Sequence, residues 1–274
     1  MRILIAGCGD VGMVLALSLI QDGHVVYGLK RDTSTLPAGV KPVQADLTRP
    51  ETLKILPTDV DCLVFMPTPG ARDPAAYEAI FIDGFKHLWA ALGSPPLRTV
   101  LVSSTAVFGE SEGGLVDEKT EPVPTGFNGK ILLQMEQLAA RCTDRLVVVR
   151  ISGIYGPGRE RLLRQAAAGG LDVQQDPPYF TNRIHRDDAA AALKHLLFID
   201  KAEALYIASD DHPAPRYEVV EWLAKKQGAE LPRGLVDAHA SRGKRVSNRR
   251  LRDSGFELTY PDYRSGYGAV LKTR

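Results

Sequence analysis

Residues 2–12 read RILIAGCGDVG, an apolar run that ends in the pattern G-x-G-x-x-G. The apolar run is typical of a buried β-strand, and the pattern after it indicates a helix over 11–21. A second apolar segment, HVVYGL (24–29), follows the Asp22-Gly23 turn. A strand, a glycine turn, a helix and a second strand in this order are the context in which the pattern forms a phosphate-binding turn.

Each glycine of the pattern has a distinct expected role. Gly7 permits the tight turn, Gly9 lets the backbone approach a pyrophosphate, and Gly12 lets the helix pack closely on the strand. Asp10 and Val11 complete the first helical turn, whose positive end would face the phosphates. The sequence therefore predicts a dinucleotide site.

The end of the second strand predicts which dinucleotide is bound. Binders of NAD place a carboxylate about 20 residues beyond the glycines to hold the ribose hydroxyls. Here Lys30 and Arg31 occupy that place, and Arg31 can pair with a 2′-phosphate, which favours NADP. Asp32 keeps NAD as the alternative, and a solvated basic loop is the plain structural interpretation. Asp46 and Leu47, after the third strand, are expected at the adenine end.

Strands and helices continue to alternate along the chain. Further strands are expected to end near residue 45 and to span 61–66, 99–104 and 145–152, with helices over 75–92 and 129–142. The strands are continuous apolar runs, as in sheets covered on both faces. Alternation of this kind predicts an α/β fold with a doubly wound parallel sheet of the Rossmann type.

The pattern loosens after residue 152. Helices near 187–199 and 215–227 and a strand over 204–209 are still expected, but 229–274 shows little periodicity. We predict a dinucleotide-binding domain over 1–152. Residues 153–274 would form a smaller, substrate-side α/β subdomain interleaved with the end of the sheet.

Composition excludes several classes of function. The net charge of +1 offers no general attraction for nucleic acid or an anionic membrane. No stretch approaches the roughly 18 apolar residues of a membrane-spanning helix. The three cysteines, Cys8, Cys62 and Cys142, have neither disulfide nor metal-site spacing. We expect a cytoplasmic protein with a small-molecule substrate and no metal.

Three later segments, together with the glycine turn, carry a family resemblance. They are VSSTAVFG (102–109), RISGIYGPG (150–158) and NRIHRDDAA (182–190). In this order they resemble the short-chain dehydrogenase/reductase superfamily, in particular its extended branch, the NAD-dependent epimerase/dehydratase family. The resemblance implies a catalytic Ser/Thr at Ser104, with Ser103 beside the cofactor.

The family's chemistry uses a tyrosine and a lysine four residues apart, and only the lysine is present. Lys130 stands in place, where the resemblance gives it catalytic and cofactor-binding roles, but Gly126 occupies the position of the tyrosine. Phe127 has no hydroxyl, so the active site is atypical. Tyr155 and Tyr179 are the candidate substitutes for the acid.

Three other features have competing interpretations. His185 is interpreted as structural, and Glu136, six residues past Lys130, as exposed. The basic run 244–252 is either a solvated face or a site for an anionic substrate, as extended family members use arginines there for nucleotide-sugar pyrophosphate. A homodimer through the helices near 75–92 and 129–142 is implied by the resemblance, although the sheet could cover the same apolar faces.

Two hypotheses of function follow. The first is an NADP-dependent oxidoreductase or epimerase-like enzyme whose substrate is unknown and could be phosphorylated or nucleotide-linked. The second is a dinucleotide-binding regulator or redox sensor without catalysis, which the absence of the tyrosine favours.

Overall fold

The computed structural model describes residues 1–273, which divide into two compact units. Unit 1 comprises residues 1–108, 122–150 and 190–206, and unit 2 comprises 109–121, 151–189 and the described residues from 207 onward. The chain thus crosses between the units several times. The crossing after residue 150 lies beside the boundary expected from the sequence, and the segment 190–206 returns to unit 1.

A seven-stranded sheet runs through unit 1 in the order β12-β7-β5-β4-β1-β2-β3. The pairings of β1 with β2 and β4, of β2 with β3, and of β4 with β5 are all parallel. The strands are β1 (Arg2–Ala6), β2 (Val25–Lys30), β3 (Lys41–Gln44), β4 (Cys62–Phe65), β5 (Arg98–Ser104), β7 (Leu146–Ile151) and β12 (Leu205–Ala208).

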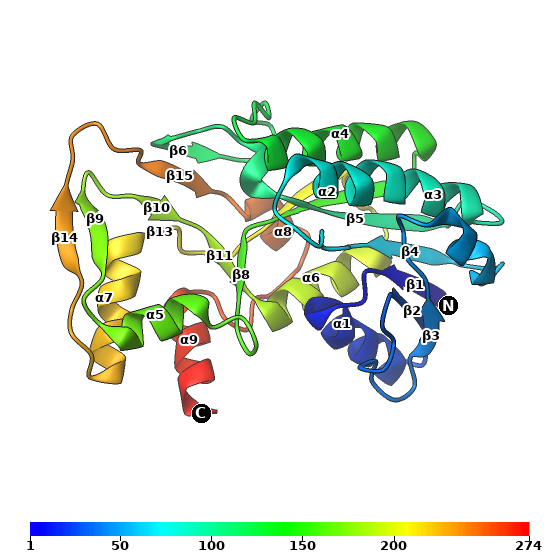
Figure 1. Cartoon of the computed structure of the whole chain (residues 1–274), viewed down its shortest axis with the longest axis horizontal. Coiled ribbons are helices and arrows are strands. Elements are labelled where there is room, and N and C mark those ends of the chain that lie inside the picture. Colours follow the sequence, from blue (N-terminus) through cyan, green and yellow to red (C-terminus); the bar gives the residue numbers. More distant parts are fainter. Residues whose placement is uncertain (274) are drawn as a thin grey trace. The chain divides into compact units, whose positions relative to one another are not determined.

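Helices cover both faces of this sheet (Figure 1). One face carries α2 (Pro74–Glu78), α3 (Gly84–Ala91) and α4 (Phe127–Cys142), and the other carries α1 (Asp10–Gln21) and α6 (Arg186–Phe198). A π-helical turn, η2 (Ala79–Asp83), joins α2 to α3, and short 3-10 turns occupy η1 (Pro50–Ile55) and η3 (Thr105–Val107). The predicted doubly wound α/β fold is confirmed.

The core of unit 1 explains why its strands read as continuous apolar runs. Ile3, Leu4 and Ile5 on β1 and Leu63 and Val64 on β4 are fully buried although neighbouring side chains point to opposite faces. The helices use their apolar stripes to cover those faces. On the two helices considered for a homodimer, near 75–92 and 129–142, the apolar residues Phe81, Leu88, Leu132 and Met135 are buried within the single chain.

Unit 2 is built from short strands and helices. A four-stranded sheet has the order β13-β10-β15-β6, and two strand pairs join β11 to β8 and β14 to β9. The strands are β6 (Glu112–Val116), β8 (Gly153–Tyr155), β9 (Asp172–Asp176), β10 (Phe180–Thr181), β11 (Arg183–His185), β13 (Ala214–Pro215), β14 (Arg233–Val236) and β15 (Gly243–Val246).

Helices α5 (Arg161–Ala168), α7 (Arg216–Gln227), α8 (Arg249–Asp253) and α9 (Tyr263–Lys272) complete unit 2. The C-terminal tail is therefore more regular than its sequence indicated, since α8, α9, β14 and β15 all lie beyond residue 229. These elements are short, so each offers too few turns or alternations for a periodic signal.

Candidate functional site

The glycine turn lies between β1 and α1 and requires glycine at its first position. Gly7 has a φ of +89°, and a Cβ built there would stand 2.4 Å from the Cα of Pro67. The amides of Gly7 and Cys8 both donate to the carbonyl of Leu29, at 3.0 and 3.1 Å. The turn is therefore fixed between β2 and the segment after β4.

The other two glycines differ in what surrounds them. A Cβ on Gly9 would meet no atom nearer than the Gly7 carbonyl at 3.9 Å, whereas one on Gly12 would lie 3.3 Å from Ile5. Gly12 thus serves the contact between helix and strand, and Gly9 faces open space. Gly9 also precedes α1, and no side chain caps this helix end. The positive end of the helix dipole suits this end to an anion.

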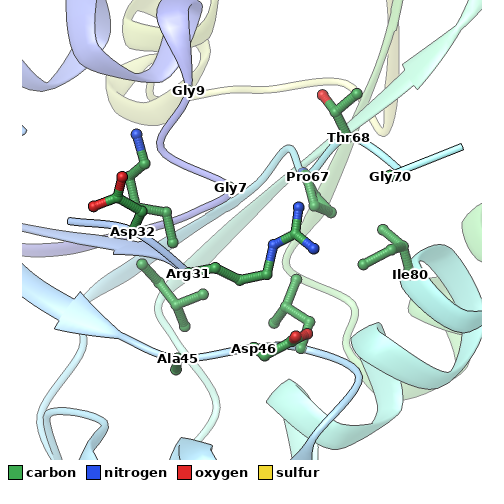
Figure 2. A pocket seen from close by; sticks show the side chains of 13 residues that line it. Gly7, Gly9, Arg31, Asp32, Ala45, Asp46, Pro67, Thr68, Gly70 and Ile80 are labelled. Atoms are coloured by element: carbon green, nitrogen blue, oxygen red, sulfur yellow. The ribbon is translucent and has the colours of Figure 1, made fainter. Parts of the chain in front are cut away.

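A pocket of about 320 Å³ adjoins the glycine turn (Figure 2). It brings together six of the predicted cofactor residues, from the turn and from the ends of β2 and β3. These are Gly7, Gly9, Lys30, Arg31, Asp46 and Leu47. Asp10, Val11 and Gly12 do not line it, because they belong to the first turn of α1, where Val11 and Gly12 are buried.

The two basic residues at the end of β2 are not equivalent. Lys30 donates to Thr35 Oγ1 at 2.7 Å, so its ammonium group is engaged. Arg31 makes no hydrogen bond or ion pair within residues 1–273, and Figure 2 shows its side chain extending across the pocket. Asp32 also lines the pocket, and its carboxylate accepts from the Ser34 amide at 2.9 Å.

Asp46 holds the loop after β3. Its carboxylate accepts from the amide and the hydroxyl of Thr48, at 2.9 and 2.8 Å. Burial alone would raise the pKa of Asp46, but these bonds and the nearby Arg31 and Arg49 lower it. The next residue, Leu47, is 5% exposed, and its carbonyl contacts His87 Nδ1 at 2.9 Å.

The sequence reasoning missed several residues of this pocket. They are Leu29, Ala45, Pro67, Thr68, Gly70 and Ile80. Pro67, Thr68 and Gly70 directly follow β4, which pairs with β1. A rule was available to find them, because ligands of parallel sheets bind beyond the carboxyl ends of the strands. Ile80 lies in the π-helical turn η2, and no sequence pattern marks such turns.

Ser104, at the end of β5, and Lys130, in α4, do not line the pocket. Ser104 ends β5, and its hydroxyl caps η3 by accepting from the Ala106 amide at 3.2 Å. A Cβ on Gly129 would stand 2.3 Å from the Ala106 carbonyl, so the first turn of α4 lies against η3. Lys130 is exposed in that turn, and its side chain makes no hydrogen bond or ion pair within residues 1–273.

The side chain of Asn128 occupies part of the space at the position of the missing tyrosine. Gly126 precedes α4, and a Cβ there would stand 2.7 Å from Asn128 Oδ1. Phe127 packs edge-on against Tyr77 with the ring centroids 5.3 Å apart. Neither residue offers a proton donor.

The expectation that Glu136 is exposed is wrong. Glu136 is 7% exposed, and both of its carboxylate oxygens bind the buried Arg150, at 3.1 and 2.8 Å. Ser103 donates to the same carboxylate at 2.5 Å, and the Arg150 guanidinium lies 4.9 Å from the centre of the Phe108 ring. Ser103 is thus held in the core of unit 1, because its hydroxyl satisfies a buried ion pair.

Tyr155, Tyr179 and His185 all belong to unit 2. Tyr155 is 3% exposed and packs against His185 and Tyr267, and burial raises the pKa of its phenol. His185 is fully buried, and its Nδ1 accepts from the Asp187 amide at 3.2 Å. Burial also lowers the pKa of His185. These contacts match the structural role expected for His185.

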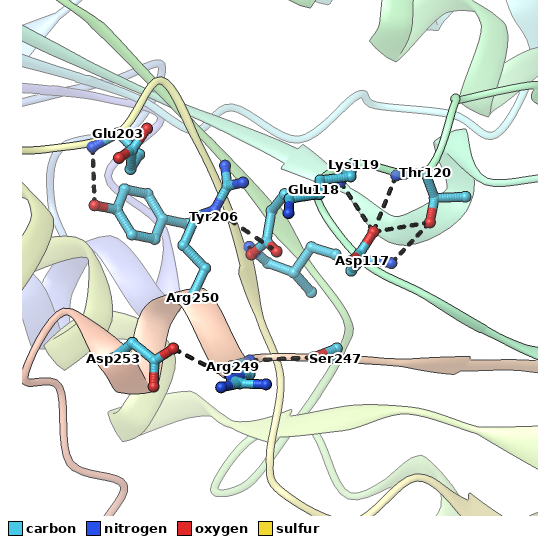
Figure 3. A network of polar contacts seen from close by, with 11 residues as sticks. Asp117, Glu118, Lys119, Thr120, Glu203, Tyr206, Ser247, Arg249, Arg250 and Asp253 are labelled. Carbon is cyan, nitrogen blue, oxygen red and sulfur yellow. Dashed lines mark hydrogen bonds and ion pairs between the residues drawn. The ribbon is translucent and has the colours of Figure 1, made fainter.

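Contacts within unit 2 engage most of the basic run 244–252. Arg249 donates to Asp253 at 3.3 Å, and Arg250 lies 3.9 Å from Glu118 (Figure 3). Arg245 donates to the Gly113 carbonyl at 2.9 Å, and Arg252 donates to the Phe256 carbonyl at 3.0 Å. The run therefore holds β15 and α8 in place and leaves few cations for an anionic ligand.

The cysteines are unpaired, and Cys8 and Cys62 are buried. Burial raises the pKa of each of these two thiols to about 11, so both stay protonated near neutral pH. Within residues 1–273 no three His, Cys, Asp or Glu side chains gather where they could hold a metal ion. In the same range, no helix combines the length and the apolar character needed to cross a membrane.

The comparison with known families agrees with this geometry. Residues 1–168 match the family model described as the RmlD substrate binding domain. The chain belongs to this family. Its members and the structural neighbours are NAD-dependent epimerase/dehydratase and short-chain dehydrogenase/reductase proteins, so the resemblance found in the sequence is confirmed.

Three relatives of this RmlD-type protein indicate the extent of the likeness. A solved structure from Methylobacillus flagellatus, assigned to the NAD-dependent epimerases/dehydratases, is 39% identical with a TM-score of 0.84, covering 99% of this chain and 98% of that one. Protein YeeZ of Escherichia coli K12 is 28% identical, covering 95% and 97%. The 2′-dehydrokanamycin reductase of Streptomyces kanamyceticus is 28% identical, covering 81% of this chain and 65% of that protein.

Proposed function

We propose that this protein is an NADP-dependent oxidoreductase or epimerase-like enzyme that acts on a small molecule. The substrate is phosphorylated or nucleotide-linked in this proposal. The observation that carries the choice of cofactor is Arg31, which extends into the pocket beside the glycine turn and makes no hydrogen bond or ion pair within residues 1–273.

The residues of this pocket fit the adenosine half of the cofactor. Gly9 leaves the backbone open where a pyrophosphate would approach, next to the uncapped end of α1. Leu29, Ala45 and Ile80 offer apolar surface for adenine. A guanidinium pairs with a phosphate in a two-pronged geometry, so Arg31 would hold the 2′-phosphate that distinguishes NADP from NAD. Asp46 would meet the adenine end.

The chemistry available to this chain is limited by the missing tyrosine. A bound nicotinamide supplies hydride transfer. Lys130, exposed in the first turn of α4, would hold the ribose, and the Ser104 hydroxyl would orient a substrate oxygen. A hydroxyl without an activating base is a weak proton donor, so the acid comes from another group. Tyr155 and Tyr179 in unit 2 are the candidates that this proposal retains.

The experiment is a titration of the purified protein and of Arg31→Gln with NADPH and NADH, followed by nicotinamide fluorescence. Wild-type protein should prefer NADPH. The variant should lose about tenfold or more in NADPH affinity, because a hydrogen bond to a charged group contributes about 1.5–3 kcal/mol. Its affinity for NADH, which lacks the 2′-phosphate, should stay unchanged.

Arg49→Gln is the matched control, since Arg49 lies near the same loop but already pairs with Glu51 at 2.8 Å. It should leave both affinities within about twofold, as exposed ion pairs contribute little. A wild-type preference for NADH, or equal losses in both variants, would contradict the assignment of Arg31. Binding of neither cofactor would remove the proposal as a whole.

A second candidate function is a dinucleotide-binding regulator or redox sensor without catalysis. Gly126 and Phe127 favour it, because they remove the proton donor and leave the glycine turn intact. It would give tight NADPH binding without turnover of carbonyl or nucleotide-sugar compounds, and a protein partner that senses the redox state of the cofactor. Equal partner affinity with NADP⁺, with NADPH and without either would count against it.

We also propose a cytoplasmic location for the enzyme. Its three cysteines are unpaired, as is usual in a reducing compartment.

A further inference from the structure

Unit 2 contains its own pocket, with a volume of about 490 Å³. Segments far apart in the sequence form it, from β8, β10 and β11 and from the first turns of α5 and α7. The lining residues are Gly153, Ile154, Tyr155, Arg159, Arg161, Leu162, Gln165, Tyr179, Thr181, Asn182, Arg183, Arg216 and Tyr267.

The charge of this pocket differs from that of the chain. Four of the lining residues are arginines and none is an aspartate or a glutamate. The whole chain, in contrast, has 34 basic and 33 acidic side chains, a net charge of +1. Like charges repel one another across a cavity, so an excess of guanidinium groups at one place favours a counter-anion.

Two of the arginines have guanidinium groups that are available to a ligand. Arg161 and Arg216 are the first residues of α5 and α7, and neither side chain makes a hydrogen bond or an ion pair with any part of 1–273. This is unlike the basic run 244–252, where Arg249 and Arg250 face Asp253 and Glu118.

Arg183 gives the pocket a buried cation. It is 5% exposed, one of its nitrogens contacts Thr181 Oγ1, and its Nη1 is buried without a hydrogen-bond partner. The guanidinium also lies 5.4 Å from the centre of the Tyr263 ring. A buried donor that lacks an acceptor is destabilising, and an anionic oxygen in the pocket would offset this cost.

The remaining walls suit the body of an organic molecule. The rings of Tyr155 and Tyr267 lie 4.3 Å apart, and burial raises the pKa of both phenols, that of Tyr267 to about 12, so they stay neutral. The hydroxyl of Tyr179 and the amide of Gln165 make no hydrogen bond with any residue of 1–273 and remain available to hydroxyl groups.

We infer that this pocket binds the anionic group of a small organic phosphate or carboxylate through Arg161, Arg183 and Arg216, with the tyrosines against its body. That this pocket is the substrate site of the enzyme rests on the proposed function. Anion binding by the pocket does not depend on it and is tested separately. The acidic group of the substrate would then bind in unit 2, to arginines that lie outside the basic run 244–252.

The test is calorimetric titration of the full-length protein with phenyl phosphate, benzoate and inorganic phosphate at low ionic strength. Phenyl phosphate should bind most tightly, because it adds a ring to the anion. In the double variant Arg161→Gln/Arg216→Gln its affinity should fall about a hundredfold, or about tenfold for each charged hydrogen bond removed. Benzoate binding tighter than phenyl phosphate would identify a carboxylate site, which also supports the inference.

The double variant Lys54→Gln/Arg141→Gln is the control, since both residues are exposed in unit 1 and their loss lowers the net charge by the same two units. Equal affinities in wild type and double variant, or an equal loss in the control, would overturn the inference. An NADPH titration of the same proteins separates the two proposals. NADPH binding without anion binding removes only this inference, and anion binding through the arginines without NADPH binding removes only the proposed function.

Discussion

Each unit buries an arginine near a carboxylate, but hydrogen bonds join the two side chains only in unit 1. There Arg150 holds both oxygens of Glu136, and Ser103 donates to one of them. In unit 2 the backbone amide of Asp210 donates to the Arg183 carbonyl at 2.7 Å, yet Asp210 Oδ2 and Arg183 Nη1 are both buried without a partner.

The difference teaches which buried charges are structural. Glu136 on α4 and Arg150 on β7 bind each other in the core of unit 1. Arg183 instead lines a pocket, and burial raises the pKa of the nearby Asp210 to about 7. Near neutral pH this carboxyl is only partly ionised, so it compensates the charge of Arg183 only in part. Arg150 Nη1 is also buried without a partner, so the difference lies in the direct bonds to the carboxylate and in the cavity. An arginine that lines a cavity and makes no hydrogen bond to its carboxylate, as in this incomplete pair, is a stronger sign of a ligand than one bonded to its carboxylate in the core, as in the complete pair of unit 1.

The largest expected effect comes from breaking the complete pair. Glu136→Ala should lower the free energy of unfolding by about 3–5 kcal/mol, because it leaves Arg150 buried and unpaired. Denaturant-induced unfolding measures it. Glu221→Ala is the control, since Glu221 forms a partly exposed pair with Lys225 at 3.0 Å. That variant should lose less than about 1 kcal/mol. Equal losses in the two variants would mean that the Glu136 pair is not structural.

The same residue shows how far the sequence could be interpreted. Glu136 follows Leu132 by four positions and precedes Ala139 by three, and all three are buried on one face of α4. The spacing thus placed Glu136 in the core. The opposite prediction came from the general rule that charged residues are exposed. That rule fails here because Arg150, on β7, pairs with Glu136 in the core.

The two pockets also differ in how far the sequence predicts their lining residues. The glycine turn is contiguous, and its backbone constraints at Gly7 and Gly9 can be read from residues 7–12, so this part of the pocket was predictable, whereas Pro67, Thr68 and Ile80 were not predicted. The pocket in unit 2 gathers residues from 153 to 267. Nothing local marks Arg161 or Arg216 as neighbours, because only the tertiary fold brings them to one cavity.

A smaller effect should follow from changing the acid of the open pair. The pKa of Asp210 is about 7 in the folded chain against an ordinary value of 3.8, so the folded state binds more protons between these values. Stability should therefore fall as the pH rises from about 4 to 7, by up to about 2–4 kcal/mol from this group. Asp210→Asn should remove that slope in denaturant unfolding followed across this pH range. Identical slopes in both proteins would show that Asp210 titrates normally.

The smallest expected effect links this acid to the anion pocket. Asp210 is mostly protonated at pH 6 and competes less for Arg183 than at pH 8, so benzoate, whose own charge is constant, should bind more tightly at pH 6. Removing one unit charge that lies some distance from the bound anion, near the protein surface, should change the binding free energy by about 1 kcal/mol, which is about fivefold in affinity. Asp211 and Asp262 also interact with Asp210, but they remain in Asp210→Asn and serve as an internal control. The pH dependence should vanish in that variant. If it persists there, another group near the pocket titrates, and the incomplete pair has no part in holding the anion.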